Sequence, residues 1–250
     1  MADLRPYEAR AAGGTRGISM TRRPVVGVLG QHVAMEAAAE RGFGRRELNV
    51  YALATMEKAF AHGMLAFGVP TLRGLDAARC CDLLDALILM PATACEGSDG
   101  CTAPDPRAEA FELAVATEAL QRRLPILAIC RGIHLLNLAL AYSAGDHVAS
   151  RTAWGEQPLT SSRHELSISD RGLRELLGFR VMVTVPHGDG HLSLGPTLRT
   201  AATGPAGTID AAIGVEGPVL AVQWHPERLQ PSDPAGEGPF RWLKQQLARA

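Results

Sequence analysis

The sequence predicts a doubly wound α/β domain, in which a mostly parallel sheet carries helices on both faces. Short apolar runs with the composition of buried strands recur along the first half of the chain, and segments with helical spacing separate them. After Tyr142 the pattern changes to a series of short strands, which predicts an added antiparallel section in the C-terminal half. The length of 250 residues suits one large domain of this kind.

The first elements follow the order strand, helix, strand. Residues 24–29 (PVVGVL) are a β-branched run that ends at Gly30, as expected for a buried parallel strand. Residues 48–67 carry apolar side chains at mostly helical spacing and are followed by Gly68, so we expect one long helix there. Residues 69–72 return to a strand pattern.

The next stretch predicts a third strand and an amphipathic helix. A short helix is expected over residues 77–84, before a buried strand over residues 85–91. The segment from 92 to 106 is rich in Gly, Pro and small residues, and loops of about 15 residues are uncommon unless they are functional or disordered. This loop is therefore a candidate wall of a site. Residues 109–123 have the spacing of an amphipathic helix.

Residues 24–250 are expected to form a single domain. Residues 1–23 combine several arginines with Gly and Ala and lack apolar periodicity, which is typical of a mobile N-terminal tail. In the C-terminal half we expect a short helix near residues 173–177 and a closing helix over residues 240–248. The expected strands of that half are residues 164–168, 181–185, 198–202, 209–213 and 219–222.

The composition narrows the function classes and the compartment. A formal net charge of −1 gives no electrostatic attraction to nucleic acid or to a membrane surface. No apolar run reaches the roughly 18 residues of a membrane span, and the start lacks a signal-peptide core, so we expect a cytoplasmic protein. The five cysteines are odd in number and lack zinc-finger spacing, so we expect neither a disulfide framework nor a structural metal. The cysteines are Cys80, Cys81, Cys95, Cys101 and Cys130. We also expect no cofactor.

One cysteine lies where a strand turns into a helix. Residues 125–129 are a short apolar run, and after Cys130 a helical pattern places Ile133, Leu136 and Leu140 on one face. Such an elbow holds a side chain above the carboxyl end of a parallel sheet. It also points the positive end of the following helix at the sulfur, which favours the thiolate. Cys130 is thus a candidate nucleophile, with an inert core thiol as the competing interpretation.

A second polar group follows a buried strand near the C-terminus. The strand over residues 219–222 runs directly into QWHPE, residues 223–227. A cysteine enzyme needs an imidazole that takes the proton of the thiol and a third group that orients this imidazole. The proline stiffens the turn, so His225 and Glu227 can point into the same crevice as Cys130. For this motif alone, a structural histidine beside a solvated glutamate is the competing interpretation.

Two motifs together resemble the class I glutamine amidotransferase superfamily. They are ILAICRGIHLLN at residues 126–137 and AVQWHPE at residues 221–227. Within this superfamily the chain resembles the γ-glutamyl-γ-aminobutyrate hydrolase-like branch, peptidase family C26. The features typical of the branch are the arginine and the LLN ending of the first motif, EAFE at residues 109–112 and PVVGV at residues 24–28. The resemblance implies a flavodoxin-like fold.

The resemblance also implies a reaction and the residues that perform it. A triad of Cys130, His225 and Glu227 would hydrolyse a small-molecule γ-glutamyl amide through a glutamyl thioester. Cys130 would attack the side-chain carbonyl, His225 would pass the proton to the leaving amine, and Glu227 would orient His225. The backbone N–H of Arg131, directly after the nucleophile, is the expected oxyanion donor. Neither nucleic acid nor a membrane is expected as a partner, and a homodimer stays open.

Several positions depart from the family pattern where oxyanion and substrate contacts are expected. The Pro-Gly-Gly-x-Asp sequence after the third strand is replaced by PATA, residues 91–94, so a non-glycine residue would have to supply the second oxyanion donor. Loss of one such donor typically costs about 100- to 1000-fold in rate. Residues 185–191 (VPHGDGH) replace a histidine-rich substrate region of the family. The expected substrate-binding residues are Ala92, Thr93, His134, His187 and Asp189.

Three functions remain open from the sequence. The leading one is a stand-alone γ-glutamyl amide hydrolase. A glutaminase subunit that passes ammonia to a synthetase partner would use the same triad, and a catalytically silent binding or regulatory homologue is suggested by the missing Gly-Gly. His187, Asp189 and His191 also invite a metal interpretation, but the sequence supplies no fourth ligand, so a polar pocket loop is favoured.

Overall fold

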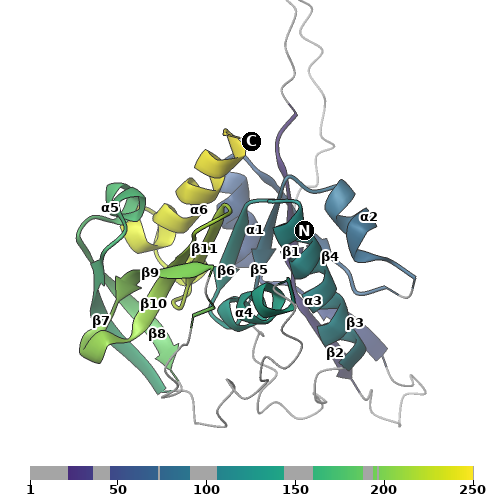
Figure 1. The fold of residues 1–250 in the computed structure, drawn as a ribbon, viewed down its shortest axis with the longest axis horizontal. Coiled ribbons are helices and arrows are strands. Elements are labelled where there is room, and N and C mark those ends of the chain that lie inside the picture. The colour runs from purple at the N-terminus through teal and green to yellow at the C-terminus, as the bar shows by residue number, and fades with distance from the viewer. Residues whose placement is uncertain are drawn as a thin grey trace, which may run out of the picture.

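A nine-stranded sheet forms the centre of the molecule, in the order β4-β1-β5-β6-β11-β10-β9-β7-β8, and helices lie on both of its faces (Figure 1). A second, two-stranded sheet pairs β2 with β3. The computed structural model describes residues 22–35, 46–72, 74–90, 106–143, 160–187, 194–195 and 197–249. Within these ranges, no helix has the length and apolar character needed to span a membrane.

The chain begins with three successive strands, strands and helices then alternate from β3 to α4, and strands dominate after α4. The strands are β1 (Val25–Leu29), β2 (Gln31–Met35), β3 (Arg46–Val50), β4 (Leu65–Val69), β5 (Ala86–Leu89), β6 (Ile126–Ile129), β7 (Thr160–Ile168), β8 (Arg180–His187), β9 (Leu198–Thr203), β10 (Ile209–Gly214) and β11 (Val219–Val222). The helices are α1 (Leu53–Ala61), α2 (Ala77–Asp82), α3 (Pro106–Gln121), α4 (Arg131–Ser143), α5 (Arg171–Leu177) and α6 (Pro234–Leu247), with 3-10 turns η3 (Pro205–Gly207) and η4 (Pro226–Arg228).

Five neighbouring strands of the central sheet, β4, β1, β5, β6 and β11, run parallel. In their register Ala128 of β6 lies between Leu89 of β5 and Ala221 of β11. All residues of β5, β6 and β11 are buried, as expected for parallel strands that are covered on both faces. Because parallel strands end at the same edge, Cys130 after β6 and Gln223 after β11 lie at one carboxyl edge.

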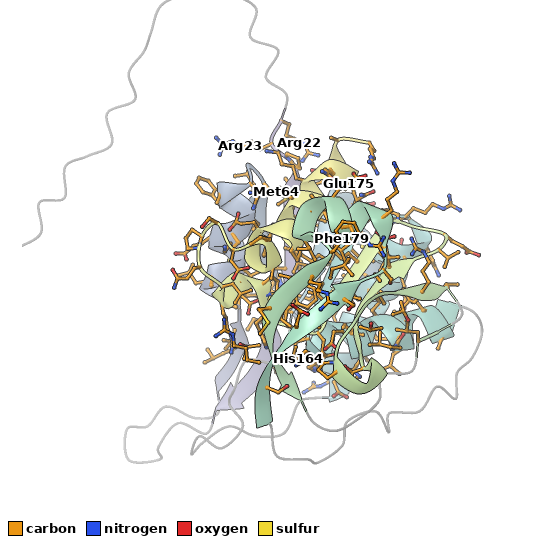
Figure 2. All side chains as sticks on the ribbon, turned by 90° about the vertical axis from the view of Figure 1, so that its left-hand side faces the viewer. Arg22, Arg23, Met64, His164, Glu175 and Phe179 are labelled. Carbon is orange, nitrogen blue, oxygen red and sulfur yellow. The ribbon has the colours of Figure 1, made fainter. Side chains whose placement is uncertain are left out.

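The remaining four strands extend the sheet in antiparallel fashion, which confirms the added section predicted for the C-terminal half. Strand β7 pairs with β9 only through Ser167 and Ile168, so most of the β7–β8 hairpin projects past the carboxyl edge. This hairpin lies at the lower left of Figure 1, and β2–β3 lies at the lower right. His164 of β7 marks the carboxyl edge, whereas Arg22 and Arg23 before β1 mark the opposite one (Figure 2).

Each face of the sheet has its own apolar core. Along β6, Leu127 and Ile129 point into the core that is covered by α1, α5 and α6. Ile126 and Ala128 point into the other core, which is covered by α2, α3 and α4. The side chains alternate because successive residues of a strand face opposite sides of the sheet. The predicted doubly wound α/β fold with helices on both faces is thus confirmed.

The helix predicted over residues 48–67 is wrong at both ends. Leu48 belongs to strand β3, and the residues from Leu65 onward form β4, so the helix is limited to α1. The strand predicted over residues 69–72 begins earlier than expected, as β4, and ends before Pro70. The helical spacing of apolar residues continues across a turn at Gly63, whose φ of 83° ends the helix.

The position of Tyr51 explains part of the wrong helix prediction over residues 48–67. Its side chain does not lie on a helix but packs against the strands, where a β-carbon at Gly30 or Gly68 would approach its ring to within 2.4 or 2.5 Å. The two-stranded β2–β3 sheet was not predicted at all. Two further predictions lie largely outside the described residues, namely the N-terminal tail at residues 1–23 and the loop at residues 92–106.

Candidate active site

Cys130 occupies a sharp turn between β6 and α4. Its φ of 52° is in the left-handed region, which is uncommon for a residue with a β-carbon. The turn is held from both sides, since the Cys130 N–H donates to the carbonyl of Val222 at 2.8 Å and its carbonyl accepts from Ile133 at 3.0 Å. The predicted elbow is therefore present, with the thiol only partly buried at the carboxyl edge.

Gly132 allows the elbow to approach the neighbouring strand. A β-carbon at this position would lie 2.4 Å from the carbonyl oxygen of Leu89 in β5. No side chain other than hydrogen fits there without displacing the backbone of α4 or β5. Gly132, two residues after the cysteine, is thus required by packing, independently of any chemistry.

His225 and Glu227 lie together directly after β11. His225 is the residue before the η4 turn, and Pro226 begins that turn. The Nδ1 atom of His225 lies 2.7 Å from Oε1 of Glu227, and the two residues are 9% and 5% exposed. A buried carboxylate at this distance fixes the imidazole orientation and leaves Nε2 for another partner.

The electrostatics of His225 connect it to Cys130. Burial lowers the pKa of His225, but hydrogen bonds with Cys130 and Glu227 and the negative charges of both outweigh burial and raise the pKa to about 9. The imidazole thus lies between the thiol and the carboxylate. This order of nucleophile, base and orienting group allows proton transfer from sulfur to nitrogen.

Gln223 also contacts the Cys130 thiol, although the sequence alone does not predict a role for this glutamine. Its Nε2 donates to Sγ of Cys130 at 3.9 Å, and its backbone N–H donates to the carbonyl of Asp210 at 2.8 Å. The sequence feature that could have identified Gln223 is its spacing from His225, because residues two apart at a strand end can point to the same side.

Arg131 and His134, in the first turn of α4, lie beside the candidate nucleophile. The Nη1 atom of Arg131 lies 3.2 Å from Oε2 of Glu112 in α3. Burial and the positive charge of Arg131 lower the pKa of His134, which keeps its imidazole neutral around pH 7. Glu112 was not predicted as a site residue, although it belongs to the EAFE sequence that carried part of the resemblance.

Other predicted site residues lie where the structure does not describe them. Ala92, Thr93 and Asp189 lie outside the described residues, and His187 is described only as the last residue of β8. Their expected contacts with the oxyanion and the substrate therefore stay predictions. Within the described ranges, no group of three or more His, Cys, Asp or Glu side chains could hold a metal ion.

Comparison with known proteins identifies the family. The sequence profile of peptidase C26 matches residues 24–227, which include both motifs of the carboxyl edge. The chain belongs to the peptidase C26 family. The resemblance expected from the two motifs is thus confirmed.

Curated relatives of this C26 chain match it over part of its length. Protein NtpR of Enterococcus hirae is 32% identical over 146 residues, which are 55% of this chain and 61% of NtpR. The γ-glutamyl-γ-aminobutyrate hydrolase PuuD of Escherichia coli is 33% identical over 137 residues, which are 49% of this chain and 54% of PuuD. The chain thus matches only somewhat more than half the length of these relatives.

Solved structures support the fold of the C26 chain. A glutamine amidotransferase from Thermotoga maritima has a TM-score of 0.61 at 14% identity, covering 92% of this chain and all of the other. The glutaminase domain of Trypanosoma brucei CTPS has a TM-score of 0.60 at 11% identity, covering 90% of this chain and 94% of the other. At these identities the likeness establishes the fold alone.

Proposed function

We propose that this chain is a cysteine-dependent hydrolase that cleaves γ-glutamyl amides to glutamate and a free amine. The observation that carries the proposal is the contact of His225 with both Cys130 and Glu227 at the carboxyl edge. Membership of the C26 family and the partial match to a γ-glutamyl-γ-aminobutyrate hydrolase support the choice of substrate class.

In the first half of the proposed reaction, the Cys130 thiolate attacks the side-chain carbonyl of the γ-glutamyl group. The C–S bond forms while the carbonyl oxygen takes up negative charge. His225, which carries the proton, donates it to the amine nitrogen as the C–N bond breaks. The products of this half are the free amine and a glutamyl thioester on Cys130.

In the second half, water replaces the amine. His225, now neutral, takes a proton from the water, and the hydroxide oxygen attacks the thioester carbonyl. The C–S bond breaks, glutamate leaves, and the proton returns to the pair of Cys130 and His225. Glu227 keeps Nε2 of the imidazole directed at the reacting atoms in both halves.

The oxyanion of both steps requires backbone donors. In this proposal the N–H of Arg131 is one of them, because the first N–H groups of a helix have no partner within the helix and point toward its N-terminal side. The positive end of the α4 dipole adds to the stabilisation of negative charge at this place. Ala92 is proposed as the second donor.

A panel of γ-glutamylated amines, which includes γ-glutamyl-γ-aminobutyrate and glutamine, tests the proposal by glutamate release. We expect release from at least one amide by the native protein and its loss in Cys130→Ala. The matched control is Cys80→Ala, because Cys80 is a buried thiol on α2 far along the chain from the motifs. Equal rates in Cys130→Ala and the native protein would refute the proposal.

Two other outcomes of the same panel would redirect the assignment. Glutamine hydrolysis that stays negligible until a second protein is added would indicate a glutaminase subunit that delivers ammonia to a synthetase. The absence of release from every amide, together with an unreactive Cys130, would indicate a silent binding homologue.

A further inference from the structure

An ion pair links the residue after the nucleophile to a helix outside the triad. Glu112 lies in the middle of α3 and is 4% exposed, and its Oε2 lies 3.2 Å from Nη1 of Arg131, the first residue of α4. The Arg131 side chain is itself 16% exposed. The pair is thus largely removed from water, and the proposed reaction makes no use of Glu112.

The electrostatic environment indicates that the Glu112 carboxylate depends on its partner. Burial raises the pKa of Glu112, while the charge of Arg131 and the hydrogen bond from it act in the opposite direction. A buried carboxylate without its cation is strongly unfavourable, so the two side chains hold each other in place.

The start of α4 also benefits from a negative charge nearby. The first turn of this helix contains no acidic residue, and its first residue is a cation, which the helix dipole disfavours at an N-terminus. Glu112 brings a carboxylate from α3 to this cation. The pair therefore offsets an unfavourable charge directly after the strained Cys130.

We infer that Glu112 is a positioning residue, which holds the Arg131 side chain and thereby fixes the backbone N–H of Arg131 that receives the oxyanion. The inference rests on the proposed function for its catalytic part. Three contacts then hold the start of α4 on the elbow: Gly132 lies against Leu89, Ile133 donates to the Cys130 carbonyl, and Arg131 pairs with Glu112.

The expected effect is on turnover rather than on substrate binding. Glu112 stabilises a donor whose interaction strengthens in the transition state, and loss of such an interaction lowers kcat without raising KM. A displacement of a catalytic group by about 1 Å costs on the order of 100-fold in rate. Glu112→Gln should therefore lower kcat about 10- to 100-fold and leave KM within about 2-fold.

The experiment compares Glu112→Gln with a matched control on the same helix. Glu118→Gln weakens one of the two ion pairs of Arg122, whose Nε lies 2.6 Å from Glu118, in a solvent-accessible part of α3. Steady-state kinetics use the γ-glutamyl amide that the native protein cleaves fastest. Arg131→Met should lose as much kcat as Glu112→Gln, and the double variant should be no worse than the poorer single one. A kcat for Glu112→Gln equal to that of Glu118→Gln would overturn the inference.

A second readout needs no substrate and no active enzyme. Hydrogen exchange of the peptide over residues 130–136 should be faster in Glu112→Gln than in both the native protein and Glu118→Gln, because the first turn of α4 is less well held. Unchanged exchange would overturn the inference, whatever the activity. If the native protein releases no glutamate but the exchange effect is present, the proposed function fails and the positioning by Glu112 stands.

Arg131→Lys provides a test that remains valid if Arg131→Met or Glu112→Gln fails to fold. It keeps the positive charge beside Glu112 but loses the planar fork of the guanidinium, so the fold should survive while the geometry of the pair changes. We expect faster exchange in the same peptide and a lower kcat. Native values of both in a folded Arg131→Lys would contradict the inference.

Discussion

Cys130 combines backbone strain with a polar surrounding. Its left-handed backbone conformation presents the thiol at the carboxyl edge, where the side chains of Gln223 and His225 contact it. Strain of this kind costs roughly 1–3 kcal/mol and persists only where neighbouring contacts maintain it. The environment of this thiol is therefore different from that of a thiol in an apolar core.

Cys130 should react with an alkylating agent much faster than the core thiols of α2. Burial raises the pKa of Cys81 to about 11 and also raises the pKa of Cys80. At pH 8 only about one Cys81 in a thousand is then ionised, and the thiolate is the reacting form. Iodoacetamide treatment of the native protein, followed by peptide mass spectrometry, should modify Cys130 at least about 100-fold faster than Cys81. Equal rates at the two sites would mean that Cys130 is an inert thiol.

The pKa of His225 predicts the alkaline limb of activity. In the proposed reaction the protonated imidazole of His225 donates to the leaving amine, so kcat/KM should fall as the pH rises through about 9. The measurement is a pH–rate profile with a γ-glutamyl amide. A fall centred near pH 6.5, the ordinary value of histidine, would contradict the contact with Cys130 and Glu227.

The same shift predicts how stability depends on pH. The folded state raises the pKa of His225 above its unfolded value of about 6.5, so the stabilisation is complete below about pH 6.5 and is lost as the pH rises through about 9. In chemical denaturation, the native protein should therefore lose more unfolding free energy than His225→Gln over this interval. If the unfolding free energies of the native protein and His225→Gln changed in parallel with pH, the raised pKa of His225 would be contradicted.

At the residue scale, the sequence was sufficient to predict those candidate site residues that follow the ends of strands. Cys130 and the pair of His225 and Glu227 were predicted because each follows a buried apolar run, and such ends meet in a parallel sheet. Glu112 and Gln223 were not predicted as site residues, because their roles arise from contacts between elements that no local pattern encodes.

At the element scale, the packing of α4 on β5 depends on Gly132. A β-carbon there would overlap the Leu89 carbonyl, so Gly132→Ala should destabilise the fold by about 1–3 kcal/mol and displace the elbow. Gly217→Ala is the control, since no atom lies within 4 Å of a β-carbon at that position. Denaturation curves of the two variants measure the difference. A Gly132→Ala variant as stable as the control would contradict the close contact.

Helix α6 is tied to α1 by a charged cluster behind the η4 turn. Glu237 accepts a hydrogen bond from Lys58 and lies 2.9 Å from Nε2 of His62, whose ring stacks on Phe240. The start of α6 packs on the turn that carries Glu227, since a β-carbon at Gly236 would lie 3.2 Å from the Pro226 carbonyl. The cluster thus supports the η4 turn, which carries Glu227, from the side of α1 and α6.

Glu237→Gln should lower the unfolding free energy at pH 7 by about 1–3 kcal/mol. The hydrogen bond from Lys58 is the main cause that lowers the pKa of Glu237. The stabilisation by Glu237 is therefore present above the unfolded pKa and is lost as the pH falls through the lowered pKa of the folded state. Denaturation at pH 7 and in acid measures the change. The control Glu175→Gln removes an exposed pair with Arg171 and should cost less than about 0.5 kcal/mol. A Glu237→Gln effect that grows in acid would contradict this assignment.

Strands with a complete apolar run were well predicted, as β1, β5, β6 and β11 show. The region from β2 to β4 was not, because apolar residues of a strand, a helix and a second strand happen to continue one helical spacing. Tyr51 shows the physical reason: its ring fills the space over two glycines of neighbouring strands, a tertiary contact that the spacing alone does not reveal.

At the scale of the whole molecule, the parallel half of the sheet brings the chemistry together and the antiparallel half extends it. Strands β6 and β11 are neighbours, so the cysteine and histidine motifs meet although they lie far apart in the sequence. The β7–β8 hairpin projects past the same edge (Figure 1). The fold class was therefore predictable from alternating elements, whereas the hairpin's extent beyond the edge depends on its register with β9.

The covalent intermediate provides the most direct test of cysteine-dependent hydrolysis. The native protein is mixed with excess γ-glutamyl amide, quenched in acid within milliseconds and digested for mass spectrometry, with Cys130→Ala as the paired sample. We predict a glutamyl adduct on the peptide that contains Cys130, formed no more slowly than glutamate is released, and neither adduct nor release in Cys130→Ala. Glutamate release without any adduct on Cys130, at a rate that Cys130→Ala retains, would contradict the proposed nucleophile.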